Sequence, residues 1–437
     1  MKTVFLLIGV SGAGKTTLLS NLKKIKDNSF YIMSSSTTRP PRESDDFILH
    51  EDIKKWNDDD YLYHISIGDK KYGLRKSEVD KIQNSQIGIT LYSPSSFKQI
   101  EEDQKNNPNI QFVTIGIDTI DNIEEQKIRV GNDESRFDTP EDFDKYLEII
   151  RNDCSITIKG DEKSLVDQIC TIGNLFIHGG VISGIHLSTL LNNHILIDKC
   201  IFDEQKIECA SYNMHLGNQY KNSDKNPKNR MIDASNNDDL LEIEPYSYII
   251  VQPIEKINLP TFVTAKFDLT VGVFQKGVIL SASTQVDPGF KGVITCLLYN
   301  PSDSKITLKV NDEFLTIEFY TTTINTKGYK GKRKDKTLNE QLSPEAITQS
   351  SNKLSKIARE ETWKFILKDV AVPIIIALVS CIFSYFQCKG AKKEVDSLKN
   401  YIDTNVTVKS ESSQSQSTNN NFYFSEAKKE ETQNDPE

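Results

Sequence analysis

The sequence predicts three structural parts: an α/β domain with a mostly parallel sheet, an all-β domain of the barrel or jelly-roll type, and a single apolar helix near the C-terminus. Apolar strand-like runs alternate with helical periodicity over residues 1–172, where the last helix is expected at Ser164–Thr171. Short β-rich runs separated by turns fill residues 178–330. An uncharged apolar run follows at Val370–Phe386. We therefore divide the chain into residues 1–172, 178–330, a basic linker and helix at 331–365, an apolar helix at 366–388 and a mostly disordered tail at 389–437.

The chain is acidic overall. Over 437 residues it carries a formal net charge of −9, so its surface offers no general field that attracts nucleic acid, and no nucleic-acid partner is expected. The seven cysteines are scattered and have no histidines at ligand spacing, which argues against a zinc site and against a disulfide framework. The N-terminus enters a strand directly, without a charged leader, so we expect the N-terminal domains to be cytoplasmic.

A glycine-rich segment follows the first apolar strand, Val4–Ile8, and fits the pattern G-x-x-x-x-G-K-[ST] of a P-loop. Its glycines let the backbone curl so that N–H groups and the positive end of the next helix surround a phosphate chain. Lys15 is then the catalytic point charge on the β/γ-phosphates, and the Thr16 hydroxyl is a ligand of Mg²⁺. We expect ATP and Mg²⁺ as cofactors, with the nucleotide held by Gly9, Ser11, Gly12, Ala13, Gly14, Lys15, Thr16 and Thr17.

A second phosphate-binding pattern follows about twenty residues later, at Ser34–Arg42. Arg39 and Arg42 are three residues apart, are bracketed by prolines that stiffen the backbone, and follow a run of hydroxyl side chains. Such a pattern soon after a P-loop indicates that a second phosphorylated molecule is held opposite ATP.

These two motifs, with Tyr61–Tyr63 and the later Lys71-Tyr72-Gly73-Leu74, resemble guanylate kinase and its relative ribosyl bisphosphate phosphokinase over residues 1–172. The resemblance implies that Ser35, Arg39, Arg42 and Tyr72 grip the acceptor phosphate. The sequence also departs from the family's pattern at three places. Tyr63 stands where the family has the glutamate that reads guanine, Leu74 replaces the threonine of a Y-G-T signature, and the strand at Ile87–Ser93 lacks the family's carboxylates. Guanine specificity is therefore not expected.

The region that corresponds to the family's arginine-bearing lid is short. It contains Arg129 and Arg136 on either side of Gly131-Asn132-Asp133. One interpretation is catalytic, since both arginines would neutralise charge on the transferred phosphoryl group. The other is that they are ordinary solvated charges at helix ends.

Three phrases of the second domain resemble the dCTP deaminase and dUTPase family over about residues 178–330. They are Ala210–Gly217, Gln252–Pro260 and Val286–Val293, and Tyr329–Lys332 resembles that family's C-terminal flap. The resemblance implies a homotrimer with nucleotide sites at its subunit interfaces. Asp287 matches the aspartate that orients water for triphosphate cleavage.

Other catalytic positions of that family are changed. Leu297 stands where a deaminase has its water-activating glutamate, Lys266–Val271 replaces an R-S-S phrase, and Asn213 replaces an aspartate. Deamination is therefore not expected. The domain is interpreted as a nucleotide-binding barrel that is degenerate as an enzyme, or as a β-domain used only for trimerisation.

The apolar run Val370–Phe386 predicts a single-pass membrane helix. As a helix it would span about 26 Å, slightly less than the ~30 Å hydrocarbon core. Trp363 and Tyr385 are placed to lie at membrane interfaces, and lysines flank both ends, so lysine asymmetry gives no orientation. A buried or re-entrant helix is the alternative, which Pro373 supports.

The sequence leaves three functions open. The first is an ATP-dependent kinase for a nucleotide or ribosyl phosphate, tethered to the membrane. The second is a catalytically degenerate, membrane-anchored nucleotide sensor, active for instance in phage defence, because phosphate-gripping residues persist where base-reading and water-activating ones are lost. The third is a nucleoside triphosphate hydrolase that uses Asp287.

Overall fold

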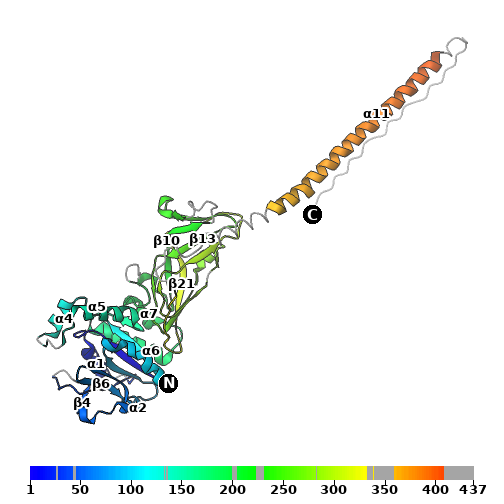
Figure 1. Cartoon of the computed structure of the whole chain (residues 1–437). Helices are drawn as coiled ribbons and strands as arrows, with labels where there is room; N and C mark the ends of the chain where they lie inside the picture. The colour runs from blue at the N-terminus through cyan, green and yellow to red at the C-terminus, as the bar shows by residue number, and fades with distance from the viewer. Residues whose placement is uncertain are drawn as a thin grey trace, which may run out of the picture. The chain divides into compact units, whose positions relative to one another are not determined.

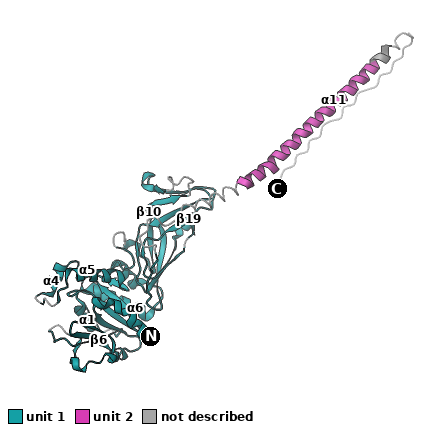
Figure 2. Ribbon diagram, in the orientation of Figure 1, with its two compact units in different colours: residues 1–351 teal, residues 352–437 magenta. Residues whose placement is uncertain are grey.

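The structure is a computed structural model. It describes residues 1–25, 28–42, 46–131, 133, 136–198, 204–222, 231–281, 283–331, 338 and 359–407. The chain forms two compact units, which are residues 1–351 and residues 352–437 (Figure 2). Much of the basic linker and helix predicted at 331–365 lies outside the described residues, as does the predicted tail beyond Thr407. The part of that predicted tail at 389–407 is helical, because α11 continues to Thr407.

The first sheet holds five parallel strands in the order β2-β7-β1-β8-β9, which confirms the predicted parallel α/β domain (Figure 1). Its central strand, β1, lies between β7 and β8, and Val4–Ile8 are all buried. A parallel strand covered on both faces is expected to be apolar throughout, as this one is. The strands are β1 (Lys2–Ile8), β2 (Phe30–Ile32), β7 (Ile87–Tyr92), β8 (Ile110–Ile117) and β9 (Ile156–Ile158).

Six helices belong to this part of the described chain, which we call the P-loop domain. The first begins directly after the glycine-rich segment and buries Leu18, Leu19 and Leu22 on one face. The last is longer than predicted, because it continues past Thr171 to His178 and carries buried Ile172 and Leu175. The helices are α1 (Lys15–Lys24), α2 (Lys76–Asp80), α3 (Ile100–Asn106), α4 (Ile123–Val130), α5 (Pro140–Glu148) and α6 (Glu162–His178).

A small second sheet in the same domain carries the predicted acceptor residues. Its strand order is β4-β3-β6-β5, in which only the β3–β4 pair is parallel. β3 begins three residues after β2, so this sheet is connected to the edge of the parallel sheet by a short turn. The strands are β3 (Ser35–Thr37), β4 (Ile48–His50), β5 (Tyr61–Ile67) and β6 (Lys70–Arg75).

The β domain confirms the predicted all-β fold. After α7 (Gly184–Asn192), an antiparallel sheet runs in the order β16-β19-β13-β10-β21-β15-β17, with β11 paired to β10. Strand β10 changes register against both neighbours, and such bulges bend a sheet. The bounds are β10 (Ser211–Asn222), β11 (Met231–Asp233), β12 (Leu240–Ile243), β13 (Tyr248–Pro253), β14 (Ile257–Asn258), β15 (Val263–Leu269), α8 (Val271–Phe274), β16 (Ile279–Ser281), β17 (Gln285–Val286), β18 (Lys291–Gly292), β19 (Cys296–Tyr299), β20 (Ile306–Lys309) and β21 (Glu313–Thr321).

One hydrophobic core runs through both domains. Phe5 of β1 contacts Phe176 of α6 edge-on, with ring centroids 5.4 Å apart, and Phe176 contacts Phe262 of the β domain at 4.7 Å. Phe5 and Phe262 belong to a single buried cluster that extends from β1 to β21, and the partly buried Phe176 packs against it. The strand that leads into the P-loop is therefore packed, through one aromatic side chain, onto the β domain.

The second unit is helical. A π-helical segment, Ile366–Ala371, leads into α11 (Val372–Thr407). The stretch Arg359–Ile402 is long and apolar enough to cross a membrane, by length and composition. Ile374, Leu378 and Ile382 on this helix are each more than half exposed.

The shared core makes a stability prediction. Replacing Phe262 by Ala should lower the free energy of unfolding by about 3–5 kcal/mol, because a fully buried ring leaves a cavity in a core common to both domains. Urea denaturation of the full chain in detergent measures this. Phe274, a 67% exposed ring of the same domain, is the matched control, and Phe274→Ala should change stability by less than about 0.5 kcal/mol. Equal effects of the two variants would contradict the shared core.

Candidate phosphate-transfer site

The segment between β1 and α1 is shaped by two glycines in left-handed conformations. Gly12 has φ +82° and Gly14, the N-cap of α1, has φ +86°. No side chain caps this helix N-terminus, so the N–H groups of its first turn are placed to meet an anion. A Cβ on Gly12 would lie 3.2–3.3 Å from side-chain atoms of Val130 and Arg129, which shows that α4 packs directly against the loop.

Lys15 lies over this loop. Its Nζ donates to the carbonyl oxygens of Gly9 at 2.6 Å and of Val10 at 2.9 Å. Burial and, to a smaller extent, the positive charge of Arg136 lower the pKa of Lys15 to about 8, although the charge of Asp138 acts in the opposite direction. That this ammonium meets a bound phosphate chain stays a prediction, while the structure shows it held by two carbonyl oxygens of the same loop.

Asp133 and Arg136 each lie near one of the two predicted phosphate sites. Arg136 is close enough to Lys15 to lower its pKa. Asp133, three residues earlier, pairs with Arg42, with 3.8 Å between carboxylate oxygen and guanidinium nitrogen. Lys15 and one acceptor arginine therefore lie near two residues that are close in the sequence. Arg129, the other predicted lid arginine, pairs with Glu125 at 2.6 Å.

The remaining predicted acceptor residues lie on or beside the small sheet. Ser35 Oγ is 3.0 Å from Thr90 Oγ1, on the parallel sheet. Arg39 is buried and donates to the carbonyl oxygen of Pro40, whereas the side chain of Arg42 is 36% exposed. Tyr72 lies opposite Thr37 in the β3–β6 register. The structure thus brings the four residues onto one sheet and the loop that leaves it.

A polar network that the sequence analysis missed stiffens this sheet. Arg75 donates to both carboxylate oxygens of Glu51, at 2.8 and 2.5 Å, and the Tyr61 hydroxyl donates to the same carboxylate at 2.6 Å. The Arg75 bonds are the main reason that the pKa of Glu51 falls to about 2. Trp56 stacks on Tyr61 at 3.9 Å. No sequence signal links residues 24 positions apart, so only the strand pairing reveals the network.

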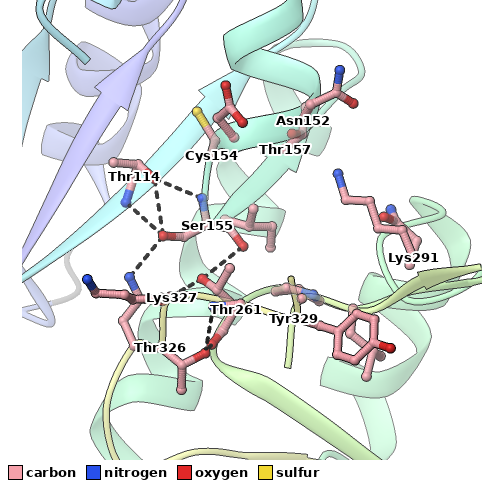
Figure 3. Close-up of a pocket in the computed structure, with 18 of the residues that line it drawn as sticks. Thr114, Asn152, Cys154, Ser155, Thr157, Thr261, Lys291, Thr326, Lys327 and Tyr329 are labelled. Atoms are coloured by element: carbon pink, nitrogen blue, oxygen red, sulfur yellow. Dashed lines mark hydrogen bonds between the residues drawn. The ribbon is translucent and has the colours of Figure 1, made fainter. Parts of the chain in front are cut away.

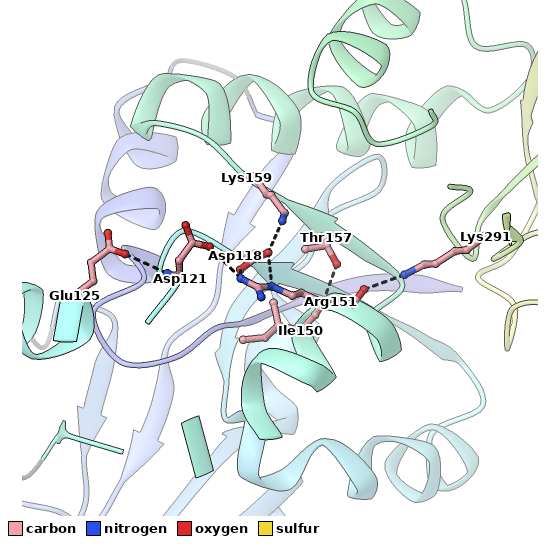
Figure 4. A network of polar contacts seen from close by, with 8 residues as sticks. All are labelled: Asp118, Asp121, Glu125, Ile150, Arg151, Thr157, Lys159 and Lys291. Atoms are coloured by element: carbon pink, nitrogen blue, oxygen red, sulfur yellow. Dashed lines mark hydrogen bonds and ion pairs between the residues drawn. The ribbon is translucent and has the colours of Figure 1, made fainter. Parts of the chain in front are cut away.

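A second missed network lies where β8 and β9 end (Figure 4). Arg151 donates to both oxygens of Asp118, at 2.8 and 2.9 Å, and Lys159 approaches the same carboxylate at 2.6 Å. Burial of Asp118 acts to raise its pKa, but the hydrogen bonds from Arg151 and Lys159 outweigh it and hold the pKa below its usual value. Lys291 of the β domain donates to the Arg151 carbonyl at 2.9 Å.

Comparison with known proteins finds one family model for each of the two domains. Residues 1–162 match the family model described as guanylate kinase, and residues 181–322 match the one described as dCTP deaminase-like. The chain joins a guanylate kinase-like domain to a dCTP deaminase-like domain. Both resemblances predicted from the sequence are thereby confirmed.

Individual relatives cover one domain each. A dCTP deaminase of Pyrococcus horikoshii is 29% identical over 129 residues, which are 30% of this chain and 77% of that protein. A guanylate kinase of Campylobacter jejuni is 35% identical over 103 residues, which are 22% of this chain. This chain spans only 50% of the length of that guanylate kinase.

Two solved structures are also similar. The guanylate kinase of Anaplasma phagocytophilum has a TM-score of 0.29 at 15% identity, covering 40% of this chain and 87% of its own. The 2′-deoxycytidine 5′-triphosphate deaminase of Agrobacterium tumefaciens has a TM-score of 0.28 at 13% identity, covering 33% of this chain and 47% of its own.

In the guanylate kinase-like domain, Tyr63 is buried against Tyr92, with ring centroids 4.9 Å apart. Its hydroxyl donates to the carbonyl oxygen of Leu91, at 3.4 Å. A phenol held in the core in this way presents no carboxylate to a purine edge. This geometry agrees with the predicted loss of guanine reading.

In the dCTP deaminase-like domain, the surroundings of Leu297 are apolar. Leu297 packs with Tyr248, Ile250 and Leu338, a residue beyond the predicted flap. Asn213 donates to Glu313 at 2.8 Å, and the Asp287 carboxylate accepts a long 3.5 Å bond from Gln285. Leu297, at the position of the deaminase glutamate, is thus partly buried among apolar and aromatic side chains. Asp287 lies in the turn before β18.

A buried carboxylate in this domain was not predicted. Glu255 is fully buried, accepts from the His215 backbone N–H at 2.9 Å and from the Tyr212 hydroxyl at 3.2 Å, and pairs with the His215 ring. These partners satisfy the carboxylate inside the fold. We interpret the cluster as structural.

The position of Lys15 predicts a pH dependence. The affinity for Mg·ATP should be full below about pH 8 and should fall above it, because the ammonium that binds phosphate is lost as the pH rises through its pKa. Equilibrium binding between about pH 7 and pH 9 measures this. Lys15→Met should bind weakly with a flat profile. A wild-type profile parallel to that of Lys15→Met would contradict the prediction.

Proposed function

We propose that this protein uses Mg·ATP to phosphorylate a small acceptor that already carries a phosphate, such as a nucleoside monophosphate or a ribosyl phosphate. One observation carries the proposal: Arg136 is close enough to Lys15 to lower its pKa, and Asp133, three residues before Arg136, pairs with Arg42. Phosphates held by Lys15 and by Arg42 would thus both lie near these two residues, which suits in-line transfer between them.

Each side chain has a limited part in this mechanism. Lys15 and the N–H groups at the start of α1 would hold the β/γ-phosphates of ATP, while Arg136 would offset charge as it develops on the moving phosphoryl group. Arg39 and Arg42 would fix the acceptor phosphate, with Ser35 and Tyr72 beside it. The acceptor oxygen belongs to a phosphate, so the protein need supply no general base.

The residues present also fit Mg²⁺. Thr16 offers a hydroxyl in the first turn of α1, and the described residues contain no cluster of three or more histidine, cysteine or acidic side chains. Mg²⁺ retains waters and phosphate oxygens and often takes few protein ligands, so a single hydroxyl beside the P-loop suffices. Bound there, the ion would neutralise phosphate charge.

For the dCTP deaminase-like domain we propose nucleotide binding without deamination, in a homotrimer. The apolar packing of Leu297 with Leu338 supports the loss of water activation, since no general base occupies that position. The helix Arg359–Ile402 would tether the assembly to a membrane with the domains in the cytoplasm, where ATP is found.

In this arrangement the β domain reports nucleotide levels to the kinase-like domain.

A phosphoryl-transfer screen tests the main proposal. The full chain in detergent is incubated with Mg·ATP and a panel of nucleoside monophosphates and ribosyl phosphates, and ADP and new products are followed. We expect ADP to appear with one phosphorylated acceptor other than GMP, and no ADP from Lys15→Ala. ATP binding without turnover on any acceptor would contradict the kinase and favour the sensor.

The acceptor arginines give a sharper prediction. Replacing both Arg39 and Arg42 by Ala should weaken acceptor binding at least about tenfold, because charge-assisted hydrogen bonds to phosphate are lost. ATP affinity should change by less than about twofold, since Lys15 and the N–H groups at the start of α1 are unchanged. Isothermal titration of each ligand separates these effects, with Lys54→Ala, an exposed lysine of the same sheet region, as control. An equal loss for both ligands would refute the assigned roles.

A further inference from the structure

The contact between the two domains of the first unit is held by hydrogen bonds within the protein (Figure 3). Asn325 donates to Ser155 Oγ at 2.9 Å, and the Thr261 N–H donates to the Ser155 carbonyl at 2.9 Å. Lys291 and Tyr329 of the β domain line the same contact. Polar groups at this contact therefore bond to each other, whereas α11 of the second unit exposes an apolar face.

The exposed face lies on the part of α11 that follows the apolar run Val370–Phe386. Val395, Leu398 and Ile402 are each more than half exposed, and their spacing of three and four residues places them on one side of the helix. The other sides of this segment carry polar residues, which are Lys389, Lys393, Asp396 and Asn400. A helix in water gains stability from such an apolar stripe only when another surface covers it.

The stripe continues towards the N-terminal end of α11 at the same heptad positions. Cys388 and Cys381 lie seven and fourteen residues before Val395. Ala391 lies seven residues before Leu398. These side chains are small, and small side chains let two helices approach closely within a membrane. One seam therefore runs along α11, which Figure 2 draws as a continuous helix.

Two opposite charges flank the aliphatic part of this seam. Val395 and Ile402 occupy position a of a heptad and Leu398 occupies position d. Glu394 is then at position g and Lys399 at position e of the same pattern. Residues at these two positions border the interface when two such helices pack together, so their charges decide which partner and which orientation fit.

The charges fit a second copy of the same helix. In a parallel, in-register pair, position g of one helix faces the following position e of the other, so Glu394 meets Lys399. An antiparallel pair would place position e opposite position e, where Lys392 and Lys399 repel each other. The residues three and four positions from Glu394 on either side are uncharged, so its own helix offers it no ionic partner there.

We propose that α11 associates side by side with α11 of a second copy of this chain, in parallel and in register, with Val395, Leu398 and Ile402 in the interface. This occupant covers the exposed aliphatic side chains and pairs Glu394 with Lys399. The association depends neither on the kinase activity proposed above nor on contacts between β domains. It joins copies of the chain through their C-terminal helices.

Disulfide cross-linking at single positions tests the proposal. The full chain is reconstituted in liposomes after four of its cysteines are replaced by Ser, which are Cys200, Cys209, Cys381 and Cys388. Val395→Cys is then compared with Lys393→Cys, the matched control on the opposite side of the helix. Oxidation should cross-link Val395→Cys at least about fivefold more than Lys393→Cys, because a parallel, in-register pair brings identical residues together at position a. The three remaining cysteines are common to both variants.

Charge reversal tests the orientation and register. In the Val395→Cys background, Glu394→Lys should lower the cross-linked fraction about threefold, because an attraction between copies becomes a repulsion. Adding Lys399→Glu exchanges the two charges and should restore cross-linking. Both positions are exposed on the helix, so neither variant disturbs the core of the first unit. A loss that Lys399→Glu does not reverse would overturn the proposed register.

Equal cross-linking of Lys393→Cys and Val395→Cys would overturn the proposal, since chains that meet only through their β domains would show no preferred helix face. Flotation of the liposomes measures the proposed membrane tether separately. Face-specific cross-linking of a chain that does not float would support the association and contradict the tether alone.

Discussion

The turn between β1 and α1 is the constraint on which the candidate site depends. Gly12 and Gly14 must adopt left-handed conformations so that α1 begins with its N–H groups unpaired, directly beyond a buried central strand. Only then do the positive end of the helix dipole and the Lys15 ammonium face the same position in the loop. Arg42, Asp133 and Arg136 can act together in phosphate transfer only because this position is fixed.

The sequence predicted those parts of the site that are local. The spacing of Gly9, Gly14 and Lys15 defines a strand, a turn and a helix, and each was found where expected. The Glu51–Arg75 and Asp118–Arg151 pairs were not predictable, because their partners are 24 and 33 residues apart and meet only through strand order. Arg129 shows that even a residue within a recognised motif cannot be assigned a role from the sequence alone. Glu125 lies one helical turn before it, and the two side chains form an ion pair.

Packing of the two domains explains the features that belong to neither alone. Phe176 links β1 to Phe262, and Lys291 donates to the Arg151 carbonyl beside the edge where β8 and β9 end. A sequence analysis that treats the domains separately places Tyr329 and Lys291 in a flap and a turn, and gives no reason to expect them beside residues of a kinase-like fold.

The most direct test of the central claim, that Lys15 and Arg42 hold two phosphates close to each other, is the affinity of adenosine 5′-pentaphosphate compared with that of ATP. In this account its extra phosphates reach the acceptor arginines, whatever base or sugar the natural acceptor carries. The account predicts binding at least about tenfold tighter than ATP, and loss of that advantage when Arg39 and Arg42 are replaced by Ala. Equal affinities for the two compounds, or an advantage that survives the double substitution, would contradict it.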